Sequence, residues 1–163
     1  MLIEIGYANI EITNTLGQNV LHLAARLDQA EMCFYLIKIL GLNVNRPDAD
    51  NNTPLHLAVQ EVCVLAAIWL SCLGAEVNMT NSEGKIPFHL AFESIQHRFF
   101  RHDVIIRQLM IKGADKTIKD AQGDDAFAYA KKCRAKKQDL LKVLKQGDER
   151  YANNCADRIE LKI

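Results

Sequence analysis

Four segments of the chain repeat one another at a nearly fixed spacing. The clearest covers residues 51–58 and reads NNTPLHLA, and it recurs as GQNVLHLA at 17–24, GKIPFHLA at 84–91 and, more weakly, GDDAFAYA at 123–130. The equivalent apolar residues Leu21, Leu55, Phe88 and Phe127 follow one another at intervals of 34, 33 and 39 residues. Self-similarity at such a period indicates small units that stack on their neighbours to bury one continuous core.

A period near 33 that carries T-P-L-H-x-A is the pattern of ankyrin repeats, and the chain resembles that family. The resemblance implies an all-α solenoid in which each repeat has a hairpin finger, an inner helix, a tight turn and an outer helix. Segments 41–45, 74–78 and 113–117 resemble the family's G-A-D-V-N stretch after the outer helix. On this frame we predict about four repeats, at 14–47, 48–80, 81–119 and 120–147, with a partial repeat at 1–13 and a tail at 148–163.

The start of the chain matches an incomplete repeat. Residues 8–14 resemble a finger whose helices are missing, and residues 1–5 are mostly apolar. Terminal units of a solenoid need a polar outer face. We therefore expect an upstream neighbour or a folded-back tail at this end, in a piece of a longer array or in a protein that natively begins with a partial repeat.

The composition, 49% hydrophobic and 25% charged, is that of an ordinary soluble domain. Its zero net charge is uneven: residues 1–82 hold 3 Lys and Arg against 8 Asp and Glu, and residues 83–163 hold 17 against 12. Such polarity can orient a charged partner.

Five cysteines without a C-x-x-C pair indicate buried thiols in a reducing compartment. The longest uncharged stretch, 62–75, is too short to span a bilayer, so we predict a cytoplasmic protein without a membrane span.

The residue before each inner helix is a candidate N-cap. Thr53, Asn19 and Asp125 have side-chain oxygens that can accept from the first turn. Ile86 has none, so the third inner helix should lose about 1 kcal/mol relative to a Thr cap, and Ile86→Thr is expected to be stabilising.

Three histidines, His22, His56 and His89, recur at the repeat spacing. In the family this histidine bonds back to the threonine and across to the neighbouring finger. Rings one repeat apart are too far from each other to share a metal ion, so we interpret all three as structural.

The outer helices should bury apolar residues at helical spacing, such as Met32 and Cys33 in the first and Leu65 and Trp69 in the second. The second outer helix, within 62–73, carries no charge on any side. Trp69 there is either a core residue, which its spacing favours, or part of an exposed partner surface.

By resemblance, a partner should bind the finger tips and the concave face of the inner helices. These positions are Arg26, Leu27, Ala49, Asp50, Asn52, Gln60, Glu61, Ser82, Glu83, Lys85, Glu93 and Ser94.

The third repeat carries about six extra residues, 95–100, between its two helices. Arg98, Phe99, Phe100 and Arg101 form an aromatic and cationic cluster of the composition enriched at binding hot spots. We predict that these four residues also bind the partner; the alternative is that the insertion extends both helices and buries one phenylalanine. His97 and His102 have no nearby carboxylate beyond Asp103, which disfavours a metal site.

No phosphate loop, G-x-S-x-G, H-E-x-x-H or spaced Cys–His motif is present, so we predict a non-catalytic protein with no cofactor, metal or small-molecule substrate. The basic run 131–137 favours a solvated cap, with nuclear import as its alternative and nucleic-acid binding disfavoured.

We predict a protein–protein interaction module or scaffold. The narrower alternatives are an ankyrin-only inhibitor of a Rel-type transcription factor, a microbial or viral effector that captures a host protein, and a fragment of a larger scaffold or channel.

Overall fold

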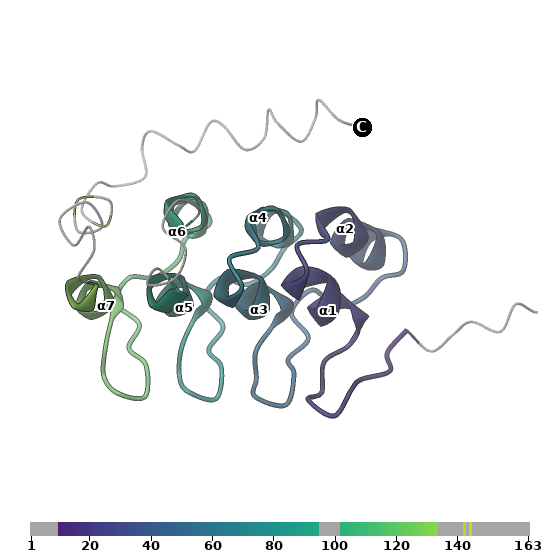
Figure 1. Ribbon diagram of the computed structural model, residues 1–163, viewed down its shortest axis with the longest axis horizontal. Coiled ribbons are helices and arrows are strands. Elements are labelled where there is room, and N and C mark those ends of the chain that lie inside the picture. Colours follow the sequence, from purple (N-terminus) through teal and green to yellow (C-terminus); the bar gives the residue numbers. More distant parts are fainter. Residues whose placement is uncertain (1–9, 95–101, 134–141, 143, 145–163) are drawn as a thin grey trace, which may run out of the picture.

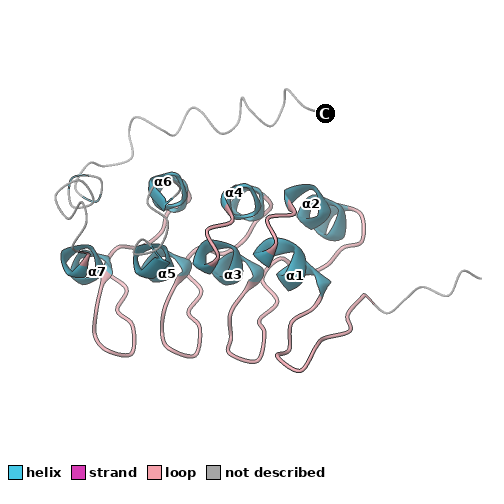
Figure 2. Cartoon of the chain, in the orientation of Figure 1, coloured by secondary structure: helices cyan, strands magenta, loops and turns pink. Residues whose placement is uncertain are grey.

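The computed structural model describes residues 10–94, 102–133, 142 and 144, and within them seven helices form two layers without a strand (Figures 1 and 2). The inner layer contains α1 (Val20–Arg26), α3 (Pro54–Gln60), α5 (Pro87–Glu93) and α7 (Ala126–Lys132). The outer layer contains α2 (Ala30–Lys38), α4 (Val64–Cys72) and α6 (His102–Ile111). Long finger loops project from the inner layer on the side away from the outer one. The predicted all-α solenoid is confirmed; the exact repeat boundaries stay a prediction.

The predicted N-caps of three inner helices are confirmed. The Thr53 hydroxyl accepts from the backbone N–H of His56, and the Asp125 carboxylate accepts from that of Ala128. Asn19 Oδ1 accepts from two backbone N–H groups of α1. Each bond satisfies a donor that the first turn of a helix leaves without an intrahelical partner.

Asn19 nevertheless fits its site less well than a threonine would. The backbone N–H of Asn19 donates to His22 Nδ1, so that ring nitrogen is an acceptor, and Asn19 Oδ1 faces it at 2.7 Å. Two acceptors therefore oppose each other, and Asn19 Nδ2 is buried without a hydrogen-bond partner. In the second repeat the Thr53 hydroxyl lies 2.8 Å from His56 Nδ1 and can donate to it, since a hydroxyl both donates and accepts.

Ile86, the N-cap of α5, has no side-chain cap bond, as predicted, but its side chain is fully buried. It belongs to the apolar core between the repeats. This burial changes the expected effect of Ile86→Thr, because the substitution would remove packed carbon atoms along with supplying a cap. The repeat pattern in the sequence showed that α5 lacks a side-chain cap. It did not show that the Ile86 side chain is buried in the core.

The core is formed where the two helical layers meet. α2 buries Cys33 and Leu36, and α4 buries Ala66, Ala67 and Leu70. Met32 and Leu65, which the spacing assigned to the packed faces, are exposed. Of the cysteines in the described residues, Cys33, Cys63 and Cys133 are buried and Cys72 is partly buried.

Trp69 packs against the preceding repeat. Its ring meets Phe34 of α2 edge-on, with centroids 5.6 Å apart and an interplanar angle of 88°. Such an edge-to-face pair stabilises by about 1 kcal/mol beyond the area it buries. Trp69 is half-buried and lies outside the buried core, so it joins two outer helices instead of filling the core that its spacing favoured, while the neighbouring Leu65 is exposed on uncharged α4.

Adjacent fingers are joined by backbone hydrogen bonds. The Ala49 N–H donates to Leu16 O at 3.0 Å, and Ala121 N–H donates to Glu83 O at 2.9 Å. Gly17, with φ 73°, lies so close to the next finger that a Cβ would meet Ala49 N at 2.7 Å. The same approach at Gly84 would bring a Cβ within 2.9 Å of Ala121 N. Glycine is therefore required here both for its backbone conformation and for the contact between fingers.

Asparagine side chains also join consecutive repeats. Asn45 Oδ1 accepts from Glu76 N–H, and Asn45 Nδ2 donates to Gly74 O. Asn78 makes the same two bonds with Asp115 N–H and Gly113 O. One asparagine per junction thus satisfies backbone groups where the outer helix of the next repeat ends.

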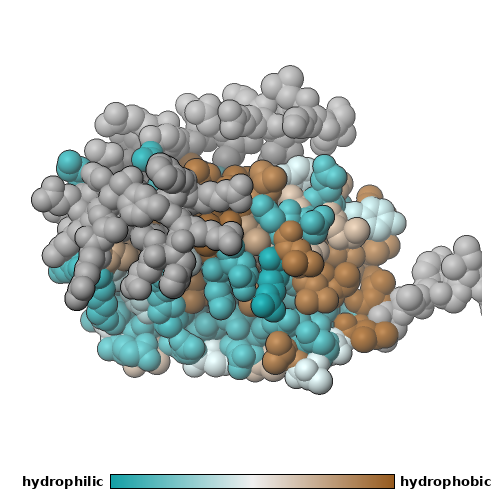
Figure 3. Space-filling model, viewed as in Figure 1, coloured by the Kyte–Doolittle hydropathy of each residue, from teal (hydrophilic) through white to brown (hydrophobic). Residues whose placement is uncertain are grey.

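The first repeat exposes apolar residues at one end of the stack. Leu23 and Met32 are exposed, whereas Leu57 and Ala66, which occupy the equivalent positions 34 residues later, are buried. Figure 3 shows an area of hydrophobic surface, in brown, at the right-hand end of the molecule, where Figure 1 places α1 and α2. The difference arises because the described residues include no helix pair stacked on this end of α1 and α2. The described helices also lack the combined length and apolar character that a membrane crossing demands.

Two cap substitutions should act in opposite directions. Asn19→Thr should raise the free energy of unfolding by about 1 kcal/mol, because it removes a buried unpaired donor and restores the hydroxyl bond to histidine. Ile86→Thr should lower it by about 1 kcal/mol, since lost core packing outweighs the gained cap. Urea unfolding of both variants measures the two effects, and a stabilised Ile86→Thr would show that capping dominates at α5.

Candidate protein-binding surface

Each of the three repeat histidines links its own helix to the next finger. The ring Nδ1 accepts from the N-cap backbone N–H at 3.3, 3.1 and 3.2 Å for His22, His56 and His89. The ring Nε2 therefore carries the proton and donates to the carbonyl oxygens of Asn52, Lys85 and Ile118 at 3.2, 3.1 and 3.0 Å. His89 thus finds the acceptor it needed without a threonine, and the structural interpretation of all three is supported.

Burial keeps these rings neutral. Desolvation lowers the pKa of His22 and His89, and it lowers that of His56 to about 4 although backbone carbonyls that accept from its ring oppose the shift. Within the described ranges, no three metal-ligating side chains are grouped closely enough to hold an ion.

The histidine bridges predict a loss of stability in mild acid. A folded pKa below the unfolded value of 6.5 means that stability is complete above pH 6.5 and falls as pH drops toward the folded value of about 4. Between pH 7 and 5, His56 alone should cost roughly 2 kcal/mol, and His22 and His89 should add in the same direction. Urea unfolding at pH 7 and pH 5 tests this prediction. The free energy of unfolding of His56→Gln should fall less between these pH values than that of wild type. A wild-type free energy of unfolding that is unchanged down to pH 5 would contradict the prediction.

The finger tips are shaped by one Asn or Asp per repeat. Asn14, Asp48, Asn81 and Asp120 each accept two backbone N–H bonds through Oδ1, from the residues two and four positions later. A side chain that bonds its own following backbone fixes a tight turn. Sequence reasoning missed this set, although its members recur at the repeat period.

A polar groove of about 530 Å³ lies between the second and third fingers and the ends of α3 and α5. Eight of the predicted binding residues line it: Asp50, Asn52, Gln60, Ser82, Glu83, Lys85, Glu93 and Ser94. Asn81 and Leu90 complete the lining and were not predicted. Sequence reasoning treated Leu90 only as part of the repeat motif, and Asn81 only as the start of a finger.

A second hollow of about 310 Å³ continues the groove toward α7. It shares Lys85 and Glu93 with the first and adds Phe92, Asp120, Gln122, Asp124, Tyr129, Lys132 and Cys133. Burial and the nearby Asp120 carboxylate raise the pKa of Tyr129, so its hydroxyl stays protonated and donates to Asp120 Oδ2 at 2.6 Å. The Tyr129 ring also stacks on His89, with centroids 5.1 Å apart. Tyr129 was not among the predicted binding residues. The sequence does mark it as unusual, because the equivalent position is leucine in the other three repeats.

Lys85 lies where the two hollows meet. Its ammonium group pairs with Glu83 at 2.6 Å and with Glu93 at 2.7 Å. Burial lowers the pKa of Lys85, but the hydrogen bonds to both carboxylates outweigh it and raise the pKa overall, so this lysine is charged.

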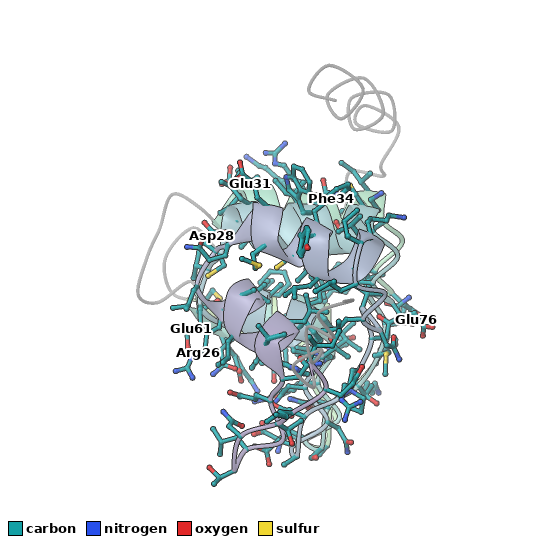
Figure 4. The ribbon with its side chains drawn as sticks, turned by 90° about the vertical axis from the view of Figure 1, so that its right-hand side faces the viewer. Arg26, Asp28, Glu31, Phe34, Glu61 and Glu76 are labelled. Atoms are coloured by element: carbon teal, nitrogen blue, oxygen red, sulfur yellow. The ribbon has the colours of Figure 1, made fainter. Side chains whose placement is uncertain are left out.

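Four predicted binding residues lie outside the lining of these hollows: Arg26, Leu27, Ala49 and Glu61. All four are exposed, and Arg26 pairs with Glu61 at 3.4 Å. Figure 4 shows that pair at the ends of the inner helices, on the side of the molecule opposite Glu76. Arg98, Phe99, Phe100 and Arg101 lie outside the described residues, as does most of the basic run 131–137. Partner binding by any of these residues stays a prediction.

The two helical layers, the joined fingers and the groove define a helical-repeat solenoid, the architecture of repeat proteins that present an extended surface. A family model described as ankyrin repeats in three copies matches residues 1–81, and the chain belongs to the ankyrin-repeat family. It is also 34% identical over 71 residues to an ankyrin repeat protein of Fowlpox virus (strain NVSL). That match covers 44% of this chain, which spans only 36% of the viral protein. Ankyrin repeats generally mediate protein–protein interaction and are typically not catalytic.

Proposed function

We propose that this chain is a non-catalytic module that binds another protein through its groove and finger tips. The observation that carries the proposal is the groove itself, which residues of two consecutive repeats line together. The bonds between fingers and the histidine bridges hold these repeats in a fixed relation. A surface fixed before binding spends little of its interaction energy on ordering, which favours specific association.

The groove can be tested with matched substitutions to arginine. Gln60 is an exposed residue of the groove, and Glu76 is exposed on the opposite side of the molecule. Gln60→Arg should lower the affinity for a partner at least tenfold, whereas Glu76→Arg should change that affinity less than twofold. Both should unfold within about 0.5 kcal/mol of wild type, since both sites are exposed.

The measurement is affinity capture from a cell lysate with quantitative mass spectrometry, followed by titration of the recovered protein against all three forms. A protein that wild type and Glu76→Arg retain and Gln60→Arg loses supports the proposal. Equal retention by both variants, or capture of chaperones alone, would contradict groove binding.

We propose as a second candidate that the chain is a viral or microbial effector that captures a host protein. Its similarity to the Fowlpox virus protein supports this alternative over a Rel-type inhibitor or a scaffold fragment. On expression in avian cells, such an effector should recover one cellular protein in near-stoichiometric amount. Recovery of no such protein, with wild-type chain folded and abundant, would count against it.

A further inference from the structure

The two hollows form one surface, which we call the acidic groove and define as the combined lining residues of both. They share Lys85 and Glu93, so the surface is continuous from the second finger to α7. Its boundaries are the second, third and fourth fingers on one side and the ends of α3, α5 and α7 on the other. A segment of a partner can therefore cross three repeats in one line.

Carboxylates outnumber cations in the acidic groove. Five carboxylates are present, Asp50, Glu83, Glu93, Asp120 and Asp124, against the two ammonium groups of Lys85 and Lys132. The formal charge of the lining is therefore −3.

Both lysines are already paired within the groove. Lys85 lies between Glu83 and Glu93, and Lys132 bonds to Asp124. The Lys85 side chain is 13% exposed, whereas those of Glu83 and Glu93 are 61% and 42% exposed. A partner thus meets carboxylate oxygens first, with the lysine beneath them.

The rest of the lining combines hydrogen-bonding groups with apolar wall surface. Gln60, Ser82 and Ser94 contribute amide and hydroxyl groups, while Leu90 and Phe92 are buried. Apolar helix faces bind through large hydrophobic side chains, and here Leu90 and Phe92 are largely withdrawn from the surface that a partner would meet. Lysine and arginine suit the groove better, since their charged ends need acceptors and their stems can lie along its walls.

We propose that the acidic groove receives a basic segment of the partner protein, an extended stretch whose lysine or arginine side chains pair with the exposed carboxylates of Asp50, Glu83 and Glu93. This inference rests on the proposed function and specifies the partner's chemistry. Electrostatic complementarity of this kind sets specificity and speeds association more than it raises affinity. The same charge repels nucleic-acid phosphates.

The test uses the full chain and three fluorescent twelve-residue peptides, (Lys-Ser)6, (Gln-Ser)6 and (Glu-Ser)6. Fluorescence anisotropy should show saturable binding of the lysine peptide alone, with an affinity that falls as NaCl rises from 50 to 500 mM because exposed charges are screened. Binding of the glutamine peptide equal to that of the lysine peptide, or no saturation by the lysine peptide below 1 mM, would overturn the inference.

Two double variants separate the groove from the general charge of the molecule. Asp50→Asn with Glu93→Gln removes two groove carboxylates, and Glu31→Gln with Glu76→Gln removes two exposed carboxylates that lie outside the groove. The first double variant should lower the affinity for the lysine peptide at least tenfold, and the second should lower it less than twofold. Equal weakening would show non-specific attraction and contradict the inference.

Failure here is distinguishable from failure of the proposed function. Suppose that Gln60→Arg abolishes binding of a protein partner but the chain shows no preference for the lysine peptide over the glutamine peptide. Binding at the groove would then stand, and the basic character of the partner would be rejected. Loss of both results would reject both statements.

Discussion

The hydrogen-bonded histidine ring is the interaction on which the stacking of this molecule depends. A neutral imidazole has one acceptor and one donor on opposite sides, and here they are used on two different repeats. His56 holds the start of α3 through Nδ1 and the third finger through Nε2. A protonated ring would lose the first of these bonds, and a rotated ring would lose both. One side chain therefore sets the position of each inner helix relative to the finger that follows it.

The groove is a product of that positioning. Its polar residues come from turns whose geometry depends on Asn81 and Asp120, and from helix ends whose spacing the histidines fix. The Lys85 pairs join a lysine that is only 13% exposed to two carboxylates that are 61% and 42% exposed. Their effect is on the surface, because they hold Glu83 and Glu93 in fixed places while burying the positive charge.

Much of this arrangement could be predicted from the sequence, since repetition shows which residues are equivalent. The caps, the histidine roles and eight lining residues follow from the repeat frame and its resemblance. The frame does not show what lies beside an equivalent residue. Met32 is exposed where Ala66 is buried, because only the latter has a described repeat stacked on it. Ile86 fills the core where Thr53 caps, a difference that depends on packing in three dimensions.

The third and fourth repeats are farther apart in sequence than the others, at 39 residues instead of 33, yet their junction keeps the common bonds. His89 reaches Ile118 O, and Ala121 still bonds to Glu83. The additional residues fall between α5 and α6, in a connection that takes no part in these bonds. The bonds between these two fingers are thus independent of the length of that connection. The spacing of the third and fourth fingers therefore needs no particular number of residues between α5 and α6, because the fingers bond to each other directly.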